Sequence, residues 1–417
     1  MTLRCSACET PAVDLDALAC GACGELLAFA LDDDSVDGAT VDANARLRRA
    51  SLEPRDRSGV WRFRELLPAV SDDAITTLRE GDVPLIDGPR GAAYAGVDRL
   101  AYLHLGMNPT ASFKDAGMTV AISHARERNA RVAVCASTGN TAASMAAYAA
   151  RAGMTAVVIA PVDGISPAKV AQTLDYGAHV VAVDGDFDDA LRAVRALDHG
   201  AVAVVNSINP YRIEGQKTAA FVLLEQRRWI APDWVVLPGG NLGNASALGK
   251  GFREARTIGL TVRIPRLAVV QASGAAPFAR AWVSGGDVVP VRARTDASAI
   301  RIGAPASWKK ARAEVHASDG TVLDVADEEI AEARAVIGRD GVGCEPASAA
   351  SLAGLRRLVA DGSVGPDADV VCVLTGHVLK DTAYAERYHA SGAPQANAIV
   401  RDADLSEYLM TLVAQRA

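Results

Sequence analysis

Short apolar runs separated by helical patterns dominate the chain from about residue 100 onward. Each run is rich in Val and Ala and alternates little with polar residues, which is typical of a strand buried on both faces. Strands of this kind form parallel sheets that helices cover. The predicted strands are Arg131–Ala136, Ala156–Ala160, His179–Val183, Ala201–Val205, Trp234–Leu237, Leu267–Gln271 and Val370–Leu374.

Helical signatures fill the intervals between these runs. Thr141–Ala152 is rich in Ala and is followed by Gly153, a residue that commonly ends a helix. Repeated strand–helix–strand order predicts an α/β fold. Because ligands of open α/β sheets bind at the carboxyl ends of strands, we expect the chemistry in the loops that follow the strands.

Composition and charge narrow the possible functions. The chain has 417 residues, with 43 basic and 50 acidic side chains and a net charge of −7, which argues against nucleic acid or an anionic membrane as a partner. The N-terminus lacks the pattern of a secretory signal, and polar residues interrupt the apolar stretch Val132–Ala150. We therefore expect a cytoplasmic protein that is not bound to a membrane.

A first cluster of chemically useful residues surrounds Lys114. Pro109 breaks any helix before it, and an apolar helical stretch, Met118–Ala125, follows it. Lys114 is thus predicted near a helix start, where the partial positive charge of the helix N-terminus lowers the pKa of an amine. A lowered pKa favours the neutral amine that a Schiff base needs. A solvated surface lysine is the alternative.

Two small-residue loops follow predicted strands and can hold anions. Ser137–Ser144 combines hydroxyl side chains with the free N–H groups of a helix start, although a plain helix cap is the alternative. Pro238–Asn244 contains three glycines, which let the backbone approach a phosphate closely. Its spacing misses the nucleotide and dinucleotide fingerprints, so it predicts a phosphate without a dinucleotide.

Two further segments add polar groups. Asn206–Thr218 offers amide, hydroxyl and cationic donors, with Arg212 as the candidate fork for a second phosphate. Thr375 follows the last predicted strand and can offer a hydroxyl to a buried ligand. Taken alone, these residues are also compatible with a solvated helix face and an ordinary turn.

In this order, the five segments resemble those of the threonine synthases, which belong to the fold type II enzymes that use pyridoxal phosphate. The resemblance extends from about residue 84 to 381 and includes Ala299–Gly303, Glu345–Ala349 and Thr375–Asp381. It implies two open, twisted, mainly parallel sheets covered by helices. It also implies a lyase that converts O-phospho-L-homoserine and water to L-threonine and phosphate in threonine biosynthesis.

The resemblance also implies a role for each matching residue. Lys114 would carry the cofactor as a Schiff base and move protons. Asn140 would face the 3′-oxygen of the cofactor ring, and Thr375 the ring nitrogen. The cofactor phosphate would be held by Gly240, Asn241, Leu242, Gly243 and Asn244. The substrate carboxylate would be bound by Ser137, Thr138 and Thr141, and the substrate phosphate by Asn206, Ser207 and Arg212, with help from Asn241.

Several positions depart from the family pattern. Ala111 replaces the usual Gly before Ser-Phe-Lys, and Ala116 replaces a frequent Arg after Lys-Asp. The upstream strand usually shows Lys-x-Glu but here reads Leu103-His104-Leu105, and Val378 follows His377 in place of Gly. None of these changes removes a named catalytic group, but they weaken the assignment of the substrate.

Four of the seven cysteines lie near the N-terminus as two Cys-x-x-Cys pairs, namely Cys5 with Cys8 and Cys20 with Cys23. Four thiolates suit a structural tetrahedral zinc, and some relatives carry an N-terminal ribbon of this kind. A redox dithiol and a vestigial ribbon are the alternatives. Cys135 and Cys372 lie in predicted strands and are expected in the core.

The predicted organisation has four parts: a zinc-ribbon-like segment at 1–30, a linker at 31–60 that includes an acidic stretch, an N-terminal catalytic half at 61–205 and a C-terminal half at 206–417. The resemblance implies a homodimer. Alternative functions are a cysteate synthase-like replacement on O-phosphoserine, a serine or threonine dehydratase, and a non-catalytic zinc-ribbon protein, against which the intact Lys114, Asn140 and Thr375 argue.

Overall fold

The computed structural model describes residues 1–31, 36–162, 167–184, 200–390 and 409–411. Most of the acidic stretch predicted in the linker, residues 32–35, lies outside the described residues. The chain divides into a unit formed by Met1–Lys380 and a second formed by Asp381–Ala417, to which α13 (Thr382–Ala390) belongs. In the described part of the chain, no helix combines the length and apolar character needed to cross a bilayer.

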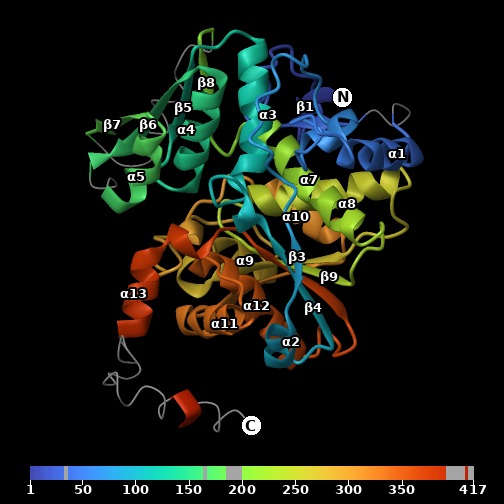
Figure 1. Ribbon diagram of the computed structural model, residues 1–417, viewed down its shortest axis with the longest axis vertical. Helices are drawn as coiled ribbons and strands as arrows, with labels where there is room; N and C mark the ends of the chain where they lie inside the picture. The colour runs from blue at the N-terminus through green and yellow to red at the C-terminus, as the bar shows by residue number, and fades with distance from the viewer. Residues whose placement is uncertain (32–35, 163–166, 185–199, 391–408, 412–417) are drawn as a thin grey trace. The chain divides into compact units, whose positions relative to one another are not determined.

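A four-stranded sheet carries the first group of predicted strands (Figure 1). Its order is β7-β6-β5-β8, and all neighbouring strands are parallel. Helix α4 runs from Asn140 to Ala152 and ends at Gly153, whose φ of 72° is left-handed as the sequence predicts. The strands and the other helix that accompanies them are β5 (Val132–Ala136), β6 (Thr155–Pro161), α5 (Pro167–Asp175), β7 (His179–Val183) and β8 (Val202–Val204).

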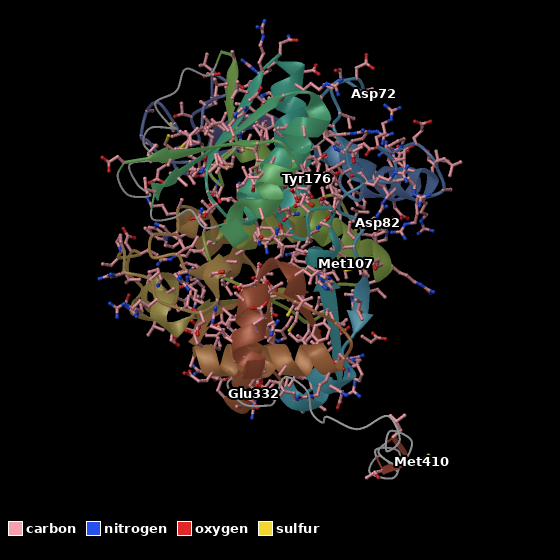
Figure 2. The ribbon with its side chains drawn as sticks, turned by 60° about the vertical axis from the view of Figure 1, so that its left-hand side comes forward. Asp72, Asp82, Met107, Tyr176, Glu332 and Met410 are labelled. Carbon is pink, nitrogen blue, oxygen red and sulfur yellow. The ribbon has the colours of Figure 1, made fainter. Side chains whose placement is uncertain are left out.

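A six-stranded sheet carries the remaining predicted strands. Its order is β11-β10-β9-β12-β4-β3, and only the edge strand β3 is antiparallel to its neighbour. Strand β4 ends in a short turn that includes Met107, labelled in Figure 2. The strands are β3 (Leu85–Asp87), β4 (Arg99–His104), β9 (Trp234–Pro238), β10 (Arg266–Ala272), β11 (Thr321–Val325) and β12 (Asp369–Leu374).

Helices cover both sheets, as the apolar strands require. Helix α3 packs on α4 and on α7, and α7 packs on α8. The backbones of α3 and α7 are in direct contact, since a Cβ on Gly215 would lie 1.9 Å from the carbonyl oxygen of Ala116. The helices are α1 (Gly38–Arg49), α2 (Pro89–Ala95), α3 (Lys114–Glu127), α7 (Pro210–Gln226), α8 (Gly243–Thr257), α9 (Pro277–Ser284), α10 (Trp308–Ala317), α11 (Asp327–Arg339) and α12 (Pro346–Ala360).

The order of elements bears on the predicted domains. Strands β3 and β4 precede the four-stranded sheet in the chain but belong to the six-stranded sheet, where β4 pairs with the late strand β12 and β3 pairs with β4. Helix α1 lies within the segment predicted as a linker. The borders at 30, 60 and 205 stay predictions, and the N-terminal half contributes two strands to the sheet that the C-terminal half mainly forms.

The N-terminal segment is a small hairpin of β1 (Thr2–Cys5) and β2 (Leu27–Ala30). Its inward residues, Leu3, Leu27 and Phe29, are buried in the same core as the apolar side of α3. The hairpin is therefore part of the first compact unit.

Candidate active site

Lys114 is brought next to Thr375 by backbone pairing. The N–H of Phe113 donates to the carbonyl of Thr375 at 2.9 Å, and the N–H of His377 donates to the carbonyl of Ala111 at 3.0 Å. These bonds join the loop before α3 to the loop after β12. The first residue of α3 and the end of β12 thus lie together, as expected for chemistry at carboxyl ends of strands.

The environment of Lys114 favours a neutral amine. Burial, followed by the charge of the Arg212 guanidinium, lowers the pKa of Lys114 to about 7, and the Glu345 carboxylate acts in the opposite direction. The sequence predicted a lowered pKa at a helix start, and the structure adds burial and Arg212 as causes. Lys114 can therefore act as a nucleophile or a base near neutral pH.

Asn140 and Thr375 both donate hydrogen bonds to Glu345, a residue to which the sequence analysis assigns no role. Glu345 lies at the start of α12, and its carboxylate accepts hydrogen bonds from Asn140 Nδ2 at 3.1 Å and from Thr375 Oγ1 at 3.2 Å. Ser348 supports the same turn by accepting a bond from the N–H of Thr375 at 2.9 Å. Glu345 lies in the family-like stretch Glu345–Ala349, which is the signal in the sequence that could have identified it.

The glycine-rich loop ends at the start of α8, where free N–H groups suit a phosphate. Leu242 has a φ of 66°, and Gly240 leaves room for the chain near Ala299 and Ile300. The side-chain oxygen of Asn241 accepts from the N–H of Ala306 at 2.7 Å. The predicted residues Gly240, Asn241, Leu242, Gly243 and Asn244 therefore form one tight turn around the helix start.

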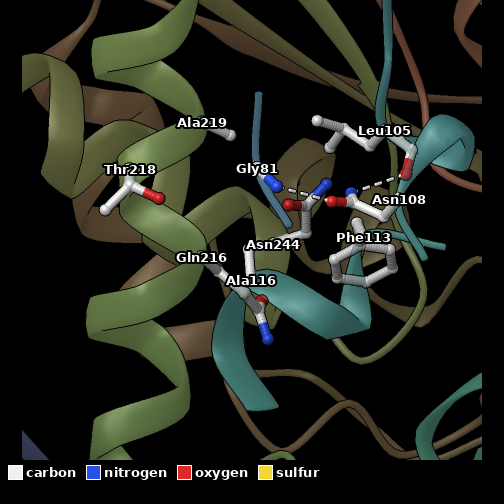
Figure 3. Close-up of a pocket in the computed structure, with 9 residues that line it drawn as sticks. All are labelled: Gly81, Leu105, Asn108, Phe113, Ala116, Gln216, Thr218, Ala219 and Asn244. Carbon is white, nitrogen blue, oxygen red and sulfur yellow. Dashed lines mark hydrogen bonds between the residues drawn. The ribbon is translucent and has the colours of Figure 1, made fainter. Parts of the chain in front are cut away.

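The side chain of Asn244 points into a small pocket (Figure 3). The pocket also contains Asn108, which accepts a hydrogen bond from the N–H of Gly81 at 2.8 Å, and Phe113, the neighbour of Lys114. Both polar atoms of the Asn244 side chain lack a partner among the described residues.

Arg212 is fully buried at the start of α7, and its guanidinium is only partly used. Nη1 donates to the carbonyl of Val205 at 3.2 Å, whereas Nε and Nη2 have no partner among the described residues. Burial lowers the pKa of Arg212 to about 10, so the group is still a cation at neutral pH. Two unpaired buried N–H donors beside Lys114 are suited to an anion.

The other predicted substrate residues lie around Arg212 and Asn140. Ser207 Oγ accepts a hydrogen bond from Asn241 Nδ2, which joins the two predicted phosphate segments. Asn206 instead binds the backbone of Ala136, at 3.1 Å to its N–H and 3.2 Å to its carbonyl. This bond fixes the end of β5, and with it the loop that carries the predicted carboxylate ligands.

Those ligands, Ser137, Thr138 and Thr141, are partly exposed at the start of α4. Ser137 Oγ accepts from the N–H of Gly139 at 3.3 Å. Buried hydroxyls of Ser112 and Ser307 lack partners among the described residues. The unpaired buried donors of Arg212, Ser112 and Ser307 fit a site built for an anionic cofactor and an anionic substrate.

The four N-terminal cysteines form one cluster. Their sulfur atoms all lie within 4.8 Å of one another, with 3.4 Å between Cys5 and Cys23 and 3.7 Å between Cys8 and Cys20. Backbone N–H groups of Ala7 and Cys8 donate to the Cys5 sulfur at 3.4 Å. This is the arrangement of a four-thiolate metal site. The buried Cys135 and Cys372 lie in β5 and β12, as predicted.

Comparison with known proteins agrees with this geometry. The family model for pyridoxal-phosphate dependent enzymes matches residues 76–376. A threonine synthase of Methanosarcina acetivorans is 46% identical over 326 residues, which cover 77% of this chain and 80% of that protein. A threonine synthase of Methanocaldococcus jannaschii is 41% identical over 386 residues, covering 91% of this chain and 93% of that protein.

Solved structures support the fold. The crystal structure of threonine synthase from Escherichia coli matches with a TM-score of 0.70 over 96% of this chain and 93% of that chain, at 19% identity. Maize serine racemase matches with a TM-score of 0.60 at 20% identity. Given the family model that spans most of the chain and relatives that are 41% and 46% identical, the chain belongs to the pyridoxal-phosphate-dependent enzymes and, among them, to the threonine synthases.

Proposed function

We propose that the protein converts O-phospho-L-homoserine and water to L-threonine and phosphate. The observation that carries this proposal is the buried guanidinium of Arg212. Two of its nitrogens have no partner in the part of the chain that the structure describes, and its charge lowers the pKa of Lys114. The loop at the start of α8 already offers a binding site for the cofactor phosphate, so the cofactor alone does not require a second anion-binding site. A second anion site beside the reactive amine favours a phosphorylated substrate over the serine and threonine substrates of a dehydratase.

The cofactor would be held by Lys114, by Asn140 and Thr375 at its ring, and by residues 240–244 at its phosphate. When bound, pyridoxal phosphate supplies the electron sink that stabilises negative charge at the substrate carbons. The protein supplies orientation and electrostatics. The unpaired donors described above are the structural support for this fit.

Lys114 would act as the base and acid of the reaction. With a pKa of about 7, its amine can remove the proton from the substrate Cα and return protons at neutral pH. In the overall change the bond from Cγ to the phosphate oxygen breaks and Cβ loses one proton. Water adds its hydroxyl to Cβ, and the proton from Cβ and the remaining proton of water go to Cγ and to the departing phosphate. Ser137, Thr138 and Thr141 would bind the carboxylate, while Ser207 and Arg212, with Asn206 behind them, would bind the phosphate.

The proposal also includes zinc at Cys5, Cys8, Cys20 and Cys23, where the sulfur cluster fits a structural ion. The homodimer and the cytoplasmic location expected from the sequence remain part of the proposal. Sedimentation velocity of the purified protein would report the oligomeric state.

The substrate-phosphate assignment is tested by replacing Arg212. Arg212→Ala should lower kcat/KM for O-phospho-L-homoserine about 10–100-fold, because a charged hydrogen bond of this kind contributes about 1.5–3 kcal/mol. The cofactor absorbance should be retained. Arg253→Ala, which removes a surface ion pair with Glu314, is the control and should keep full activity. Unchanged kinetics in Arg212→Ala would refute the role of Arg212. Loss of the cofactor absorbance would show that Arg212 binds the cofactor phosphate instead of the substrate phosphate.

A further inference from the structure

Ser307 lies at a point where two helices begin beside the same loop. It is the residue before α10 and is 1% exposed, and α8 begins at Gly243 within the glycine-rich loop. A Cβ on Gly243 would lie 3.9 Å from the hydroxyl oxygen of Ser307. The side chain of Ser307 is therefore next to the loop in which the proposed function places the cofactor phosphate.

The backbone around Ser307 is tied to this loop. The N–H of Ser307 donates to the carbonyl of Asn241 at 3.3 Å, and the N–H of Ala306 donates to Oδ1 of the same asparagine at 2.7 Å. The carbonyl of Ser307 lies 3.4 Å from the hydroxyl of Ser246, which donates to it from the first turn of α8. These bonds hold Ser307 beside the turn that starts α8.

The hydroxyl of Ser307, in contrast, is unused. A serine before a helix usually accepts a hydrogen bond from an N–H in the first turn, but Ser307 makes no such bond. Its buried oxygen has no hydrogen-bond partner in the part of the chain that the structure describes. Because a buried polar group without a partner costs free energy, native proteins rarely keep one unless a ligand or a water binds it.

The surroundings of this hydroxyl suit an anion. The first N–H groups of α8 and of α10 have no partner within their own helices, and both helix starts carry partial positive charge. The first turn of α10 contains Lys309 and Lys310 and no acidic residue. A hydroxyl adds one proton to these donors. A phosphate fits the set, because its oxygens accept hydrogen bonds and its charge matches the positive helix starts.

We propose that the Ser307 hydroxyl donates to the cofactor phosphate held by residues 240–244, so that the phosphate has ligands from the starts of both α8 and α10. The inference rests on the proposed function, which assigns the cofactor phosphate to this loop. It adds a side-chain donor to a turn whose free backbone N–H groups suit a phosphate. Ser307 thus helps to hold the cofactor and takes no part in the proton transfers at the substrate.

The test compares two cofactors on the full-length, cofactor-free protein. Pyridoxal phosphate and pyridoxal carry the same aldehyde, but pyridoxal lacks the phosphate, so the ratio of their affinities isolates what the phosphate contributes. Titrations followed by visible absorbance give both affinities. Ser307→Ala should weaken the binding of pyridoxal phosphate about 10–100-fold, as expected for the loss of a hydrogen bond to a charged group. Its affinity for pyridoxal should equal that of the wild-type protein.

A matched control lies at the other end of the same helix. Ser318 follows α10 and is 6% exposed, and its hydroxyl donates to the carbonyl of Val315 at 2.9 Å and accepts from the N–H of Leu267 at 3.2 Å. Ser318→Ala should lower the melting temperature of the cofactor-free protein and leave the ratio of the two cofactor affinities unchanged. Ser307→Ala removes only an unpaired oxygen, so the melting temperature of the cofactor-free protein should stay the same or rise.

The ³¹P resonance of bound pyridoxal phosphate gives a second readout that needs no turnover. It should move in Ser307→Ala and stay in place in Ser318→Ala. Ser307→Thr keeps a hydroxyl at this position and should recover part of the affinity for pyridoxal phosphate.

Equal affinities of the wild-type protein and Ser307→Ala for pyridoxal phosphate would overturn the proposal, as would an equal loss of affinity for both cofactors. An unchanged cofactor affinity with a raised KM for O-phospho-L-homoserine would also overturn it, because Ser307 would then bind the substrate phosphate. The proposed function fails separately. A wild-type protein that makes no threonine, with the predicted loss of affinity in Ser307→Ala, would refute the reaction and keep the role of Ser307. Threonine formation with unaltered cofactor affinities would do the reverse.

Discussion

Ala111 adopts a backbone conformation that glycine adopts more readily than alanine. Its φ is 66°, in the left-handed region, where an L-residue other than glycine costs about 1–2 kcal/mol. The family's usual glycine adopts this conformation freely. Since the carbonyl of Ala111 binds the N–H of His377 beside Lys114, the strain lies in the loop that positions the reactive lysine.

Replacing Ala111 by glycine should therefore stabilise the protein. We expect Ala111→Gly to raise the free energy of unfolding by about 0.5–1 kcal/mol, after allowance for the greater entropy of glycine in the unfolded chain. Urea denaturation of the cofactor-free protein measures it. Ala149→Gly, in the buried middle of α4, is the control and should lose about 1 kcal/mol or more. If Ala111→Gly and Ala149→Gly destabilise the protein equally, the backbone at Ala111 is not strained.

The pKa of Lys114 predicts how cofactor attachment depends on pH. Only the neutral amine reacts, so the rate at which the cofactor-free protein acquires its visible absorbance should rise with a midpoint near the pKa of about 7. Arg212→Gln should move the midpoint upward, because it removes a positive charge that disfavours the protonated lysine. Glu345→Gln should move the midpoint downward, because the substitution removes a negative charge that favours the protonated lysine.

Arg253→Gln, far from the site on the surface of α8, serves as the control for this pH profile. A midpoint near 10.5, the ordinary value for lysine, would contradict the burial of Lys114. Shifts of equal sign in the Arg212 and Glu345 variants would contradict the electrostatic explanation.

Single residues also mark the limit of what the sequence could predict about the site. The pattern located every loop that the structure brings together, including those of Lys114, Asn140 and Thr375. It could not show that Glu345 joins two of them, because that contact depends on how the loops after β5 and β12 are placed around the start of α12. It also could not show that Asn206 would use its carboxamide on the Ala136 backbone.

At the scale of elements, helices α7 and α8 are held together by buried charges. Lys217 is fully buried and lies 2.5 Å from Glu214 and 2.7 Å from Glu254. Lys250 pairs with Glu214 as well and donates to the carbonyl of Phe29 at 2.7 Å. Helix α7 begins at Pro210, close to Arg212, and α8 begins at Gly243, in the glycine-rich loop. This network therefore joins the two helices whose starts carry the two predicted anion sites.

Breaking the network should be costly. Lys217→Met removes the closest cation of the buried Glu254 and leaves Glu214 with Lys250 alone, so it should reduce the free energy of unfolding by about 3–5 kcal/mol. Adding Glu254→Gln should recover part of the loss, because one uncompensated charge disappears. Chemical denaturation measures both variants. A single Lys217→Met variant as stable as the wild-type protein would show that the network has no stabilising role.

The N-terminal hairpin is attached to the same helices. Phe29 lies edge-on to Tyr211, with ring centroids 4.9 Å apart, and Asp16 pairs with Arg128 at the end of α3 at 2.7 Å. Loss of the ion proposed for the cysteine cluster should therefore weaken the packing around the starts of α7 and α8.

Metal analysis should find about one zinc per chain at the four-thiolate site. A strong chelator should lower the melting temperature of the wild-type protein, because structural zinc contributes directly to folding. The Cys20→Ser variant should begin at the lower temperature and show no further change. Absence of zinc together with an unaltered melting temperature would contradict the metal site.

Elements were predicted best where both faces of a strand are buried. All seven predicted strands are present, with ends that differ by at most one residue. The edge strands β3 and β11 escaped prediction, and so did β4, although five of its six residues are buried. Strand β3 has three residues, and Thr321 and Asp324 interrupt the apolar pattern of β11. A half-exposed edge strand need not be apolar, so its pattern resembles that of a loop.

At the scale of the whole molecule, the sequence predicted the α/β class and the placement of the chemistry, because both follow from the general rule on carboxyl ends of strands. It did not predict that β3 and β4 would join the sheet formed mainly by later strands. That pairing is non-local, and local hydrophobic pattern carries no information on which strands become neighbours.

The central claim is that two anion sites and one reactive lysine form a threonine synthase. The most direct measurement is to incubate the purified, cofactor-loaded protein with O-phospho-L-homoserine and to quantify threonine and free phosphate in the same samples. We predict equal amounts of both products, with neither formed by Lys114→Ala. Phosphate without threonine would indicate elimination, and neither product from a cofactor-loaded protein would indicate another substrate, with O-phosphoserine and sulfite tested next. Either result would contradict the account.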